Sequence, residues 1–127
     1  EGKSVPSMTT LAGLYDRAQD MKLQPPFDLP VSWTKRKARL DLKTPYNFVS
    51  TADIIGGNSG SPVVNRAGEF VGIIFDGNLQ SLPWDYAFTE KQGRATSVHS
   101  AAILEALNQV YDTKELAREL VNGRRKP

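Results

Sequence analysis

The 127-residue sequence has no cysteine and a single histidine, His99. Without cysteine, the chain cannot form disulfide bonds, thiolate zinc sites or a cysteine nucleophile. One histidine also excludes a metal site built from several histidines.

Long apolar runs and a strong charge imbalance are also lacking. No run approaches the ~20 residues that cross a bilayer, and no basic segment followed by an apolar one suggests a signal peptide. The 16 basic and 14 acidic residues give a formal net charge of +2, which excludes a strongly basic nucleic-acid tail. A hydrophobic content of 39% predicts one globular domain with one core. Because the chain begins at Glu1 rather than Met, we expect a piece of a longer protein.

Both ends of the chain have helical periodicity. A stripe at spacings of three and four predicts a helix over residues 7–24, capped by Thr9 or Thr10 and stopped by Pro25-Pro26. Residues 25–46 predict an extended connection with one or two helical turns. Near the end, an apolar face over residues 103–111 predicts another helix. A last helix should begin with a capping box of Asp112 and Glu115 and stop at Asn122-Gly123.

The middle of the chain predicts short strands. Residues 48–51, 62–65 and 69–75 are rich in β-branched and aromatic side chains, and residues 66–68 form a hairpin loop. Weaker strands are predicted at residues 86–88 and 95–98. This order of elements predicts either an α+β fold or a β-barrel with helical flanks.

The segment Gly56-Gly57-Asn58-Ser59-Gly60-Ser61-Pro62 carries the most chemical information. A serine nucleophile needs a tight turn with small neighbours, and the N–H groups of Gly57 and Ser59 could hold a developing oxyanion. The alternative is an ordinary Gly/Ser-rich surface turn. An α/β-hydrolase elbow does not fit because position 61 is serine rather than glycine, and a phosphate loop does not fit because no lysine follows the glycines.

The strands that follow this turn make it resemble the nucleophile region of chymotrypsin-like serine proteases. Further matching segments are Leu42 to Ile55 before the turn, Phe75-Asp76-Gly77-Asn78 and Ser97-Val98 after it, and Thr10 to Tyr15 near the start. With these segments, the chain is similar to the bacterial dipeptidyl-peptidase 7 and 11 family. This resemblance implies a serine exopeptidase that removes dipeptides from free amino termini of peptides, in the periplasm or at the cell surface. It implies no metal and no organic cofactor.

The resemblance also implies roles for individual residues. Ser59 is the nucleophile, and the backbone N–H groups of Gly57 and Ser59 form the oxyanion hole. The strand that borders the pocket would place Phe75, Asp76 and Gly77 against the substrate. In this family, arginine at the position of Gly77 accompanies acidic residues before the scissile bond, whereas glycine accompanies hydrophobic ones, so we expect a hydrophobic preference.

The expected fold is mainly β with helical flanks: the second half of a chymotrypsin-like double β-barrel, without the amino-terminal barrel. Residues 1–44 would end the family's helical domain, residues 45–98 would form the serine-bearing barrel portion, and residues 99–127 would form terminal helices. The catalytic histidine and aspartate should lie in the missing amino-terminal region. His99 follows Ser59 by forty residues, where the family has no base, so we expect a helix-start residue and an inactive isolated piece.

Acidic residues surround the predicted site. Residues 53–90 contain one basic residue, Arg66, and five acidic ones: Asp53, Glu69, Asp76, Asp85 and Glu90. Such a surround would favour a substrate α-ammonium, with Asp76 the nearest candidate by sequence. Asp53 lies six residues before Ser59, where trypsin-like enzymes keep their selecting acid, but we expect it to bind the serine loop instead.

Other interpretations of the sequence remain open. A protease homologue without activity could serve as a binding or scaffold module. The basic clusters at residues 35–39 and 124–126 could bind nucleic acid, but they lack interleaved aromatic residues, so we expect a solvated face. Surface left bare by the missing barrel could favour self-association, for instance as a homodimer.

Overall fold

The computed structural model describes residues 5–124, which divide into two compact units. The sheet unit comprises residues 5–9 and Pro45–Ser100, and the helical unit comprises Thr10–Thr44 and residues 101–124. Within the described range, no helix is both long enough and apolar enough to cross a bilayer.

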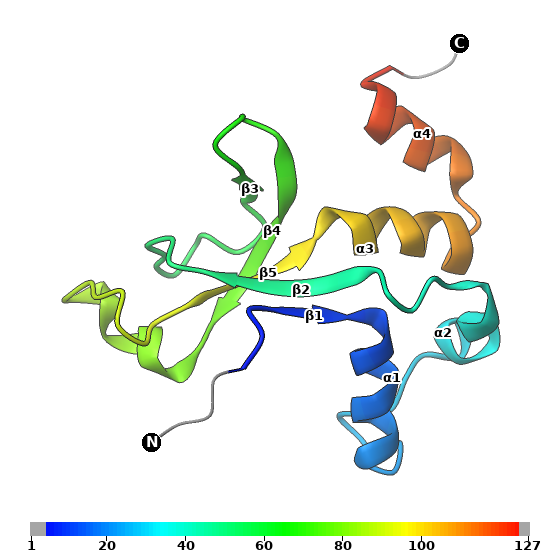
Figure 1. Ribbon diagram of the computed structural model, residues 1–127, viewed down its shortest axis with the longest axis horizontal. Helices are drawn as coiled ribbons and strands as arrows, with labels where there is room; N and C mark the ends of the chain where they lie inside the picture. Colours follow the sequence, from blue (N-terminus) through cyan, green and yellow to red (C-terminus); the bar gives the residue numbers. More distant parts are fainter. Residues whose placement is uncertain (1–4, 125–127) are drawn as a thin grey trace. The chain divides into compact units, whose positions relative to one another are not determined.

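The sheet unit is built on five strands in the order β1-β2-β5-β4-β3 (Figure 1). The strands are β1 (Met8–Thr10), β2 (Pro45–Ser50), β3 (Pro62–Val64), β4 (Phe70–Gly77) and β5 (Ala95–His99). The pairs β2–β5, β4–β5 and β3–β4 are antiparallel. The β-rich centre with helical flanks that the sequence predicted is confirmed, and its sheet is mostly antiparallel. The hairpin between β3 and β4 turns at Gly68, whose φ of +79° suits glycine.

A β-bulge interrupts the pairing of β4 with β5. Ile74 lies opposite Ser97 and Asp76 lies opposite Thr96, so Phe75 is an extra residue on β4. Because directly opposed residues share a face of the sheet, Ile74 and Gly77 lie on one face and Asp76 lies on the other.

The strand predicted at residues 86–88 is wrong. A 3-10 helix, η2 (Leu79–Asp85), occupies the preceding stretch, and the N–H groups of Tyr86 and Ala87 both donate to the Pro83 carbonyl, at 3.0 and 2.9 Å. The rings of Trp84 and Phe88 pack at a centroid distance of 5.0 Å. Three residues of alternating pattern were too few to compete with these local contacts.

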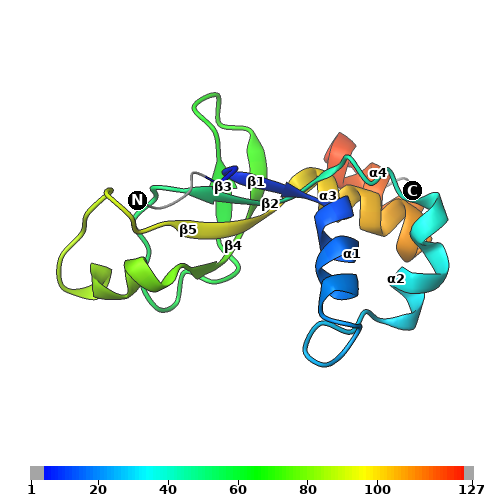
Figure 2. The ribbon, with the colours of Figure 1, turned by 60° about the horizontal axis from the view of Figure 1, so that its bottom comes forward.

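The helical unit contains α1 (Leu11–Asp20), α2 (Val31–Arg36), the short η1 (Lys37–Arg39), most of α3 (Ser100–Glu105), a π-helical turn η3 (Ala106–Val110) and α4 (Lys114–Asn122) (Figure 2). The predicted stripe is confirmed where α1 buries Leu11, Tyr15 and Ala18. Neither threonine caps α1 with its side chain: Thr10 makes no cap hydrogen bond, and the Thr9 hydroxyl accepts from the Asn47 N–H at 3.1 Å.

The predicted capping box of α4 is also wrong. Thr113 precedes the helix without a side-chain cap, and the Asp112 carboxylate instead binds the guanidinium groups of Arg36 and Arg39. The end of α4 is as predicted: Gly123 adopts φ +63° and its N–H donates to the Glu119 carbonyl at 2.8 Å.

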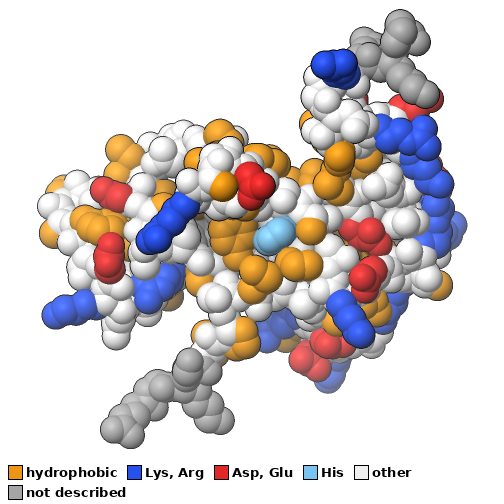
Figure 3. Space-filling view, turned by 45° about the horizontal axis from the view of Figure 1, so that its top comes forward, with side chains coloured by type: hydrophobic (Ala, Val, Ile, Leu, Met, Phe, Trp, Pro, Cys, Tyr) orange, Lys and Arg blue, Asp and Glu red, His pale blue; other side chains and the backbone are white. Residues whose placement is uncertain are grey.

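Lys and Arg side chains are prominent along one side of the surface in Figure 3. In the cluster at residues 35–39, Arg36 and Arg39 pair with Asp112, and the Lys37 ammonium lies 4.7 Å from the centre of the Tyr15 ring. Three of its basic side chains therefore have intramolecular partners. Of the second basic cluster, Arg125 and Lys126 lie outside the described residues.

Candidate active site

The serine loop is a tight turn between β2 and β3. Gly57 and Gly60 adopt φ values of +100° and +89°, which explains why glycine flanks the central residues. The Asn58 side-chain oxygen accepts the Ile55 N–H at 2.7 Å, and the Asn58 carbonyl accepts the Ser61 N–H at 3.0 Å. Asn58 thus holds both arms of the turn.

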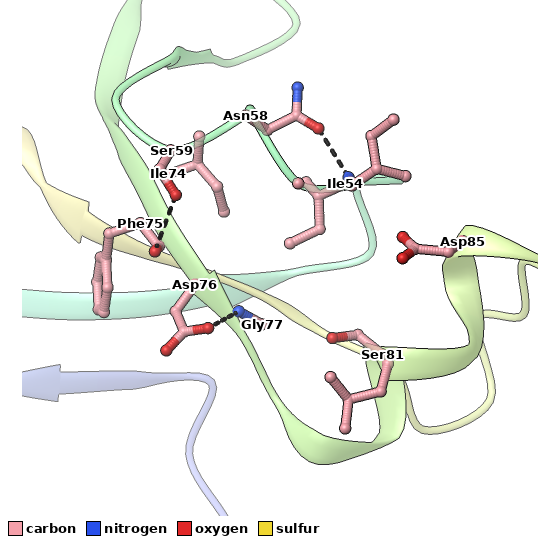
Figure 4. A pocket seen from close by; sticks show the side chains of 12 residues that line it. Ile54, Asn58, Ser59, Ile74, Phe75, Asp76, Gly77, Ser81 and Asp85 are labelled. Atoms are coloured by element: carbon pink, nitrogen blue, oxygen red, sulfur yellow. Dashed lines mark hydrogen bonds between the residues drawn. The ribbon is translucent and has the colours of Figure 1, made fainter.

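Strand β4 anchors the loop. The Gly60 N–H donates to the Ile74 carbonyl at 2.8 Å, and the Ile74 N–H donates to the Ser61 carbonyl at 3.1 Å. The exposed Ser59 hydroxyl donates to the carbonyl of Phe75, the bulged residue, at 3.3 Å (Figure 4). The hydroxyl is therefore presented at a defined place beside the strand.

Within the described residues, three backbone N–H groups of the loop have no hydrogen-bond partner: those of Gly56, Gly57 and Ser59. The N–H groups of Asn58, Gly60 and Ser61 are used inside the turn or on β4. The N–H groups of Gly57 and Ser59 are the two donors that the sequence predicted for an oxyanion, and both are available to a ligand.

A pocket of about 210 Å³ opens beside Ser59. It is lined by one stretch before the serine, by part of β4, and by η2: Ile54, Ile55, Gly56, Asn58, Ser59, Ile74, Phe75, Asp76, Gly77, Ser81, Leu82 and Asp85. The structure therefore brings Ser59 together with all three predicted substrate-binding residues. Of the predicted site residues, only Gly57 is not part of the lining.

Gly77 leaves room that Ser81 fills. A Cβ placed on Gly77 would lie 2.2 Å from the Ser81 hydroxyl oxygen and 3.4 Å from Ile54 Cδ1. The Ser81 hydroxyl is held there by donating to the Asn78 carbonyl at 2.7 Å. Glycine at position 77 therefore lets Ser81 pack directly against β4.

The profile of the peptidase S46 family matches residues 1–122. The chain belongs to the peptidase S46 family. It is 41% identical over 76 residues to Dipeptidyl-peptidase 7 of Phocaeicola vulgatus and, over the same length, to the Asp/Glu-specific dipeptidyl-peptidase of Shewanella putrefaciens. Each match covers 60% of this chain and 10% of the relative, so the aligned part spans about a tenth of these curated relatives. The expected resemblance to dipeptidyl peptidases is confirmed.

Solved structures show the same fold. The crystal structure of Porphyromonas endodontalis DPP11 in complex with substrate matches 95% of this S46 chain and 19% of its own, with a TM-score of 0.81 and 21% identity. The complex of that protein with the dipeptide Arg-Asp matches 96% of this chain and 18% of its own, with a TM-score of 0.74 and 19% identity.

One residue that positions the pocket of this S46 chain was given no role in the sequence analysis, although it stands beside the predicted site. Asn78 directly follows Gly77, and it closes the loop that carries η2. Its backbone N–H donates to the Arg94 carbonyl, its side-chain oxygen accepts the Arg94 N–H, and its side-chain amide donates to the Gln92 carbonyl, each at 2.9 Å. The pocket residues Ser81, Leu82 and Asp85 had no local signal, because only this loop closure brings them to Ser59.

Neither His99 nor Asp53 lines the pocket of this S46 chain. His99 ends β5 opposite Gly72, and its ring meets the Phe48 ring edge-on at a centroid distance of 5.7 Å. The hydrogen bond predicted from Asp53 to the serine loop is wrong: within residues 5–124 Asp53 forms none, because Asn58 already holds the loop. Those residues also contain no cluster of three or more acidic or histidine side chains that could hold a metal ion.

Proposed function

We propose that this chain carries the nucleophile of a serine dipeptidyl peptidase. The observation that supports it best is the exposed Ser59 hydroxyl, held beside β4 with the unpaired N–H groups of Gly57 and Ser59 in the same turn. Ser59 Oγ attacks the carbonyl after the second substrate residue, and its proton passes to a base. The two N–H groups stabilise the oxyanion, the dipeptidyl acyl-enzyme forms as the amine leaves, and water hydrolyses it.

The base and its orienting aspartate lie outside these 127 residues in this proposal. No histidine lines the pocket, and the resemblance assigns both groups to an amino-terminal barrel that pairs with this sheet as the other half of a chymotrypsin-like fold. The isolated chain should then be nearly inactive, since loss of the base in one well-studied protease costs roughly 10⁶-fold in kcat. The family resemblance further supports a periplasmic or cell-surface location.

The substrate would lie along β4. The backbone of Phe75 to Gly77 would pair with the substrate backbone, and the residue before the scissile bond would enter the pocket. Ile54, Ile55 and Leu82 offer apolar walls, which supports a preference for a hydrophobic residue there. Asp76, on the opposite face of β4 from Gly77, would attract the substrate α-ammonium.

The test compares two fluorogenic dipeptides in the full-length protein, one with a free amino terminus and one with the amine blocked. Both end in the same hydrophobic residue. We expect cleavage of the free-amine substrate alone, and its loss in Ser59→Ala. The matched control is Ser61→Ala, which alters a serine of the same turn that does not line the pocket.

The second candidate function is a binding or scaffold module without activity. It is favoured by one observation, the lack of any histidine among the pocket-lining residues. A folded full-length protein that cleaves neither substrate, or whose activity is indifferent to Ser59→Ala, would overturn the peptidase proposal and support the module.

A further inference from the structure

The pocket beside Ser59 contains two carboxylates and no Lys or Arg among its lining residues. The Asp76 carboxylate accepts the N–H of its neighbour Gly77 at 2.8 Å. Asp85 differs: its carboxylate points from η2 into the pocket, towards the side formed by Ile54 (Figure 4). Among the described residues, the Asp85 carboxylate has no hydrogen-bond or ion-pair partner.

The two carboxylates serve different parts of the pocket. As consecutive residues of a strand, Asp76 and Gly77 lie on opposite faces of β4. A substrate side chain that enters beside Ser59 meets the wall formed by η2, which contributes Ser81, Leu82 and Asp85. Asp85 is therefore the charged group of the wall that such a side chain approaches.

The walls between Ser59 and Asp85 suit an aliphatic chain. Ile54, Ile55 and Leu82 are apolar, and Ser81 is engaged with the Asn78 carbonyl. The long stem of lysine or arginine could lie against these walls while its charged end approaches Asp85. A glutamate or aspartate side chain would bring a second negative charge to the same place, with no cation among the lining residues to offset it.

We propose that Asp85 is a specificity-determining residue, which lets the pocket accept Lys or Arg as well as apolar residues before the scissile bond and makes it reject Asp or Glu. This inference rests on the proposed peptidase function and adds a charge preference to it. A close carboxylate discriminates between opposite charges even at a partly solvated site, because the two interactions have opposite sign.

The test uses three free-amine dipeptide substrates in the full-length protein, identical except for Leu, Lys or Glu before the scissile bond. We expect the wild type to cleave the Lys substrate at least about tenfold better than the Glu substrate, measured as kcat/KM. Asp85→Asn should lower this Lys/Glu ratio by roughly tenfold. Asp85→Glu should keep the ratio, and Asp85→Lys should invert it.

The matched control is Asp53→Asn, which removes an acid at the trypsin-like sequence position that does not line the pocket. An unchanged ratio in both Asp85→Asn and Asp85→Lys, or a shift in Asp53→Asn instead, would overturn the role of Asp85. If Asp85→Asn no longer cleaves even the Leu substrate, the Lys/Glu ratios of Asp85→Glu and Asp85→Lys test the role of Asp85 instead. Wild-type protein without Ser59-dependent cleavage of the Leu substrate would instead overturn the proposed function itself, and this inference with it.

Discussion

At the scale of single residues, Gly57 combines a conformational and a chemical task. Its φ of +100° disfavours any side chain, although a Cβ there would meet no atom within 4 Å. Gly57→Ala should therefore act through the backbone, destabilising the protein by about 1–2 kcal/mol and lowering kcat/KM by roughly 10- to 100-fold as its N–H turns away. Denaturant unfolding and peptidase kinetics measure the two effects.

Gly56 provides the control for this prediction. A methyl group added there would also meet open space, but Gly56 lacks a positive φ. Gly56→Ala should change the stability of the protein little. Equal losses in the two variants would mean that bulk, and not backbone conformation, limits this loop.

A second residue-scale prediction concerns the contact of Gly77 with Ser81. Gly77→Ala places a methyl group 2.2 Å from the Ser81 hydroxyl oxygen, so the serine must rotate and lose its bond to Asn78. We expect a loss of about 1–3 kcal/mol in unfolding free energy. Ser81→Gly in the same chain should recover part of it, as measured by a double-mutant cycle. Additive effects of the two substitutions would contradict this contact.

At the scale of elements, the loop from Asn78 to Arg94 depends on the packing of Trp84 against Gly93. A Cβ on Gly93 would lie 2.3–2.6 Å from three atoms of the indole, and Trp84 is only 4% exposed. Gly93→Ala should displace the ring, lower stability by about 1–3 kcal/mol and weaken substrate binding in the pocket. Thermal unfolding followed by tryptophan fluorescence measures the first effect.

Gly13 provides the control, because alanine at this position should raise the stability of the protein rather than lower it. It lies in α1, and a Cβ there would meet nothing within 4 Å. Gly13→Ala should stabilise the protein by up to about 1 kcal/mol through helix propensity. Destabilisation of similar size by both alanine variants would contradict the packing role of Gly93.

The elements also differ in how well the sequence predicts them. Strand β4 and helix α1 carry long apolar patterns, and both were predicted to within a few residues. The serine loop and Gly77 were predictable because their chemistry is contiguous in sequence. Asp85 and Ser81 line the pocket because Asn78 closes a long loop. Asp112 does not cap α4 as predicted because its carboxylate binds two arginines that are distant in sequence. Such long-range contacts leave no periodic signal.

At the scale of the whole molecule, stability should depend on pH through Asp112. The hydrogen bonds from Arg39 and Arg36 lower the pKa of this carboxyl below its ordinary value of 3.8. A lowered folded-state pKa gives stability that is present above the unfolded pKa and is lost as the pH falls through the folded one. Asp112→Asn should thus be slightly less stable than wild type at neutral pH, and the difference should vanish in acid below that range.

This effect should be small, because the pair is exposed to solvent and salt weakens it. Asparagine keeps the positive backbone φ of 54° that Asp112 adopts, so the variant isolates the charge. Thermal unfolding between neutral and acidic pH measures it. A difference that persists in acid would show that lost charge is not the cause.

The bulge at Phe75 determines on which face of β4 each later residue of the strand lies. Side chains alternate between the two faces of a strand, so the extra residue makes Gly77, rather than Asp76, share a face with Ile74. If Phe75 instead paired with Thr96, every later residue of β4 would shift by one and Asp76 and Gly77 would exchange faces. Deletion of Phe75 would keep both faces and remove only the carbonyl that accepts the Ser59 hydroxyl, so the extra residue is what allows β4 to hold that hydroxyl and keep its register with β5.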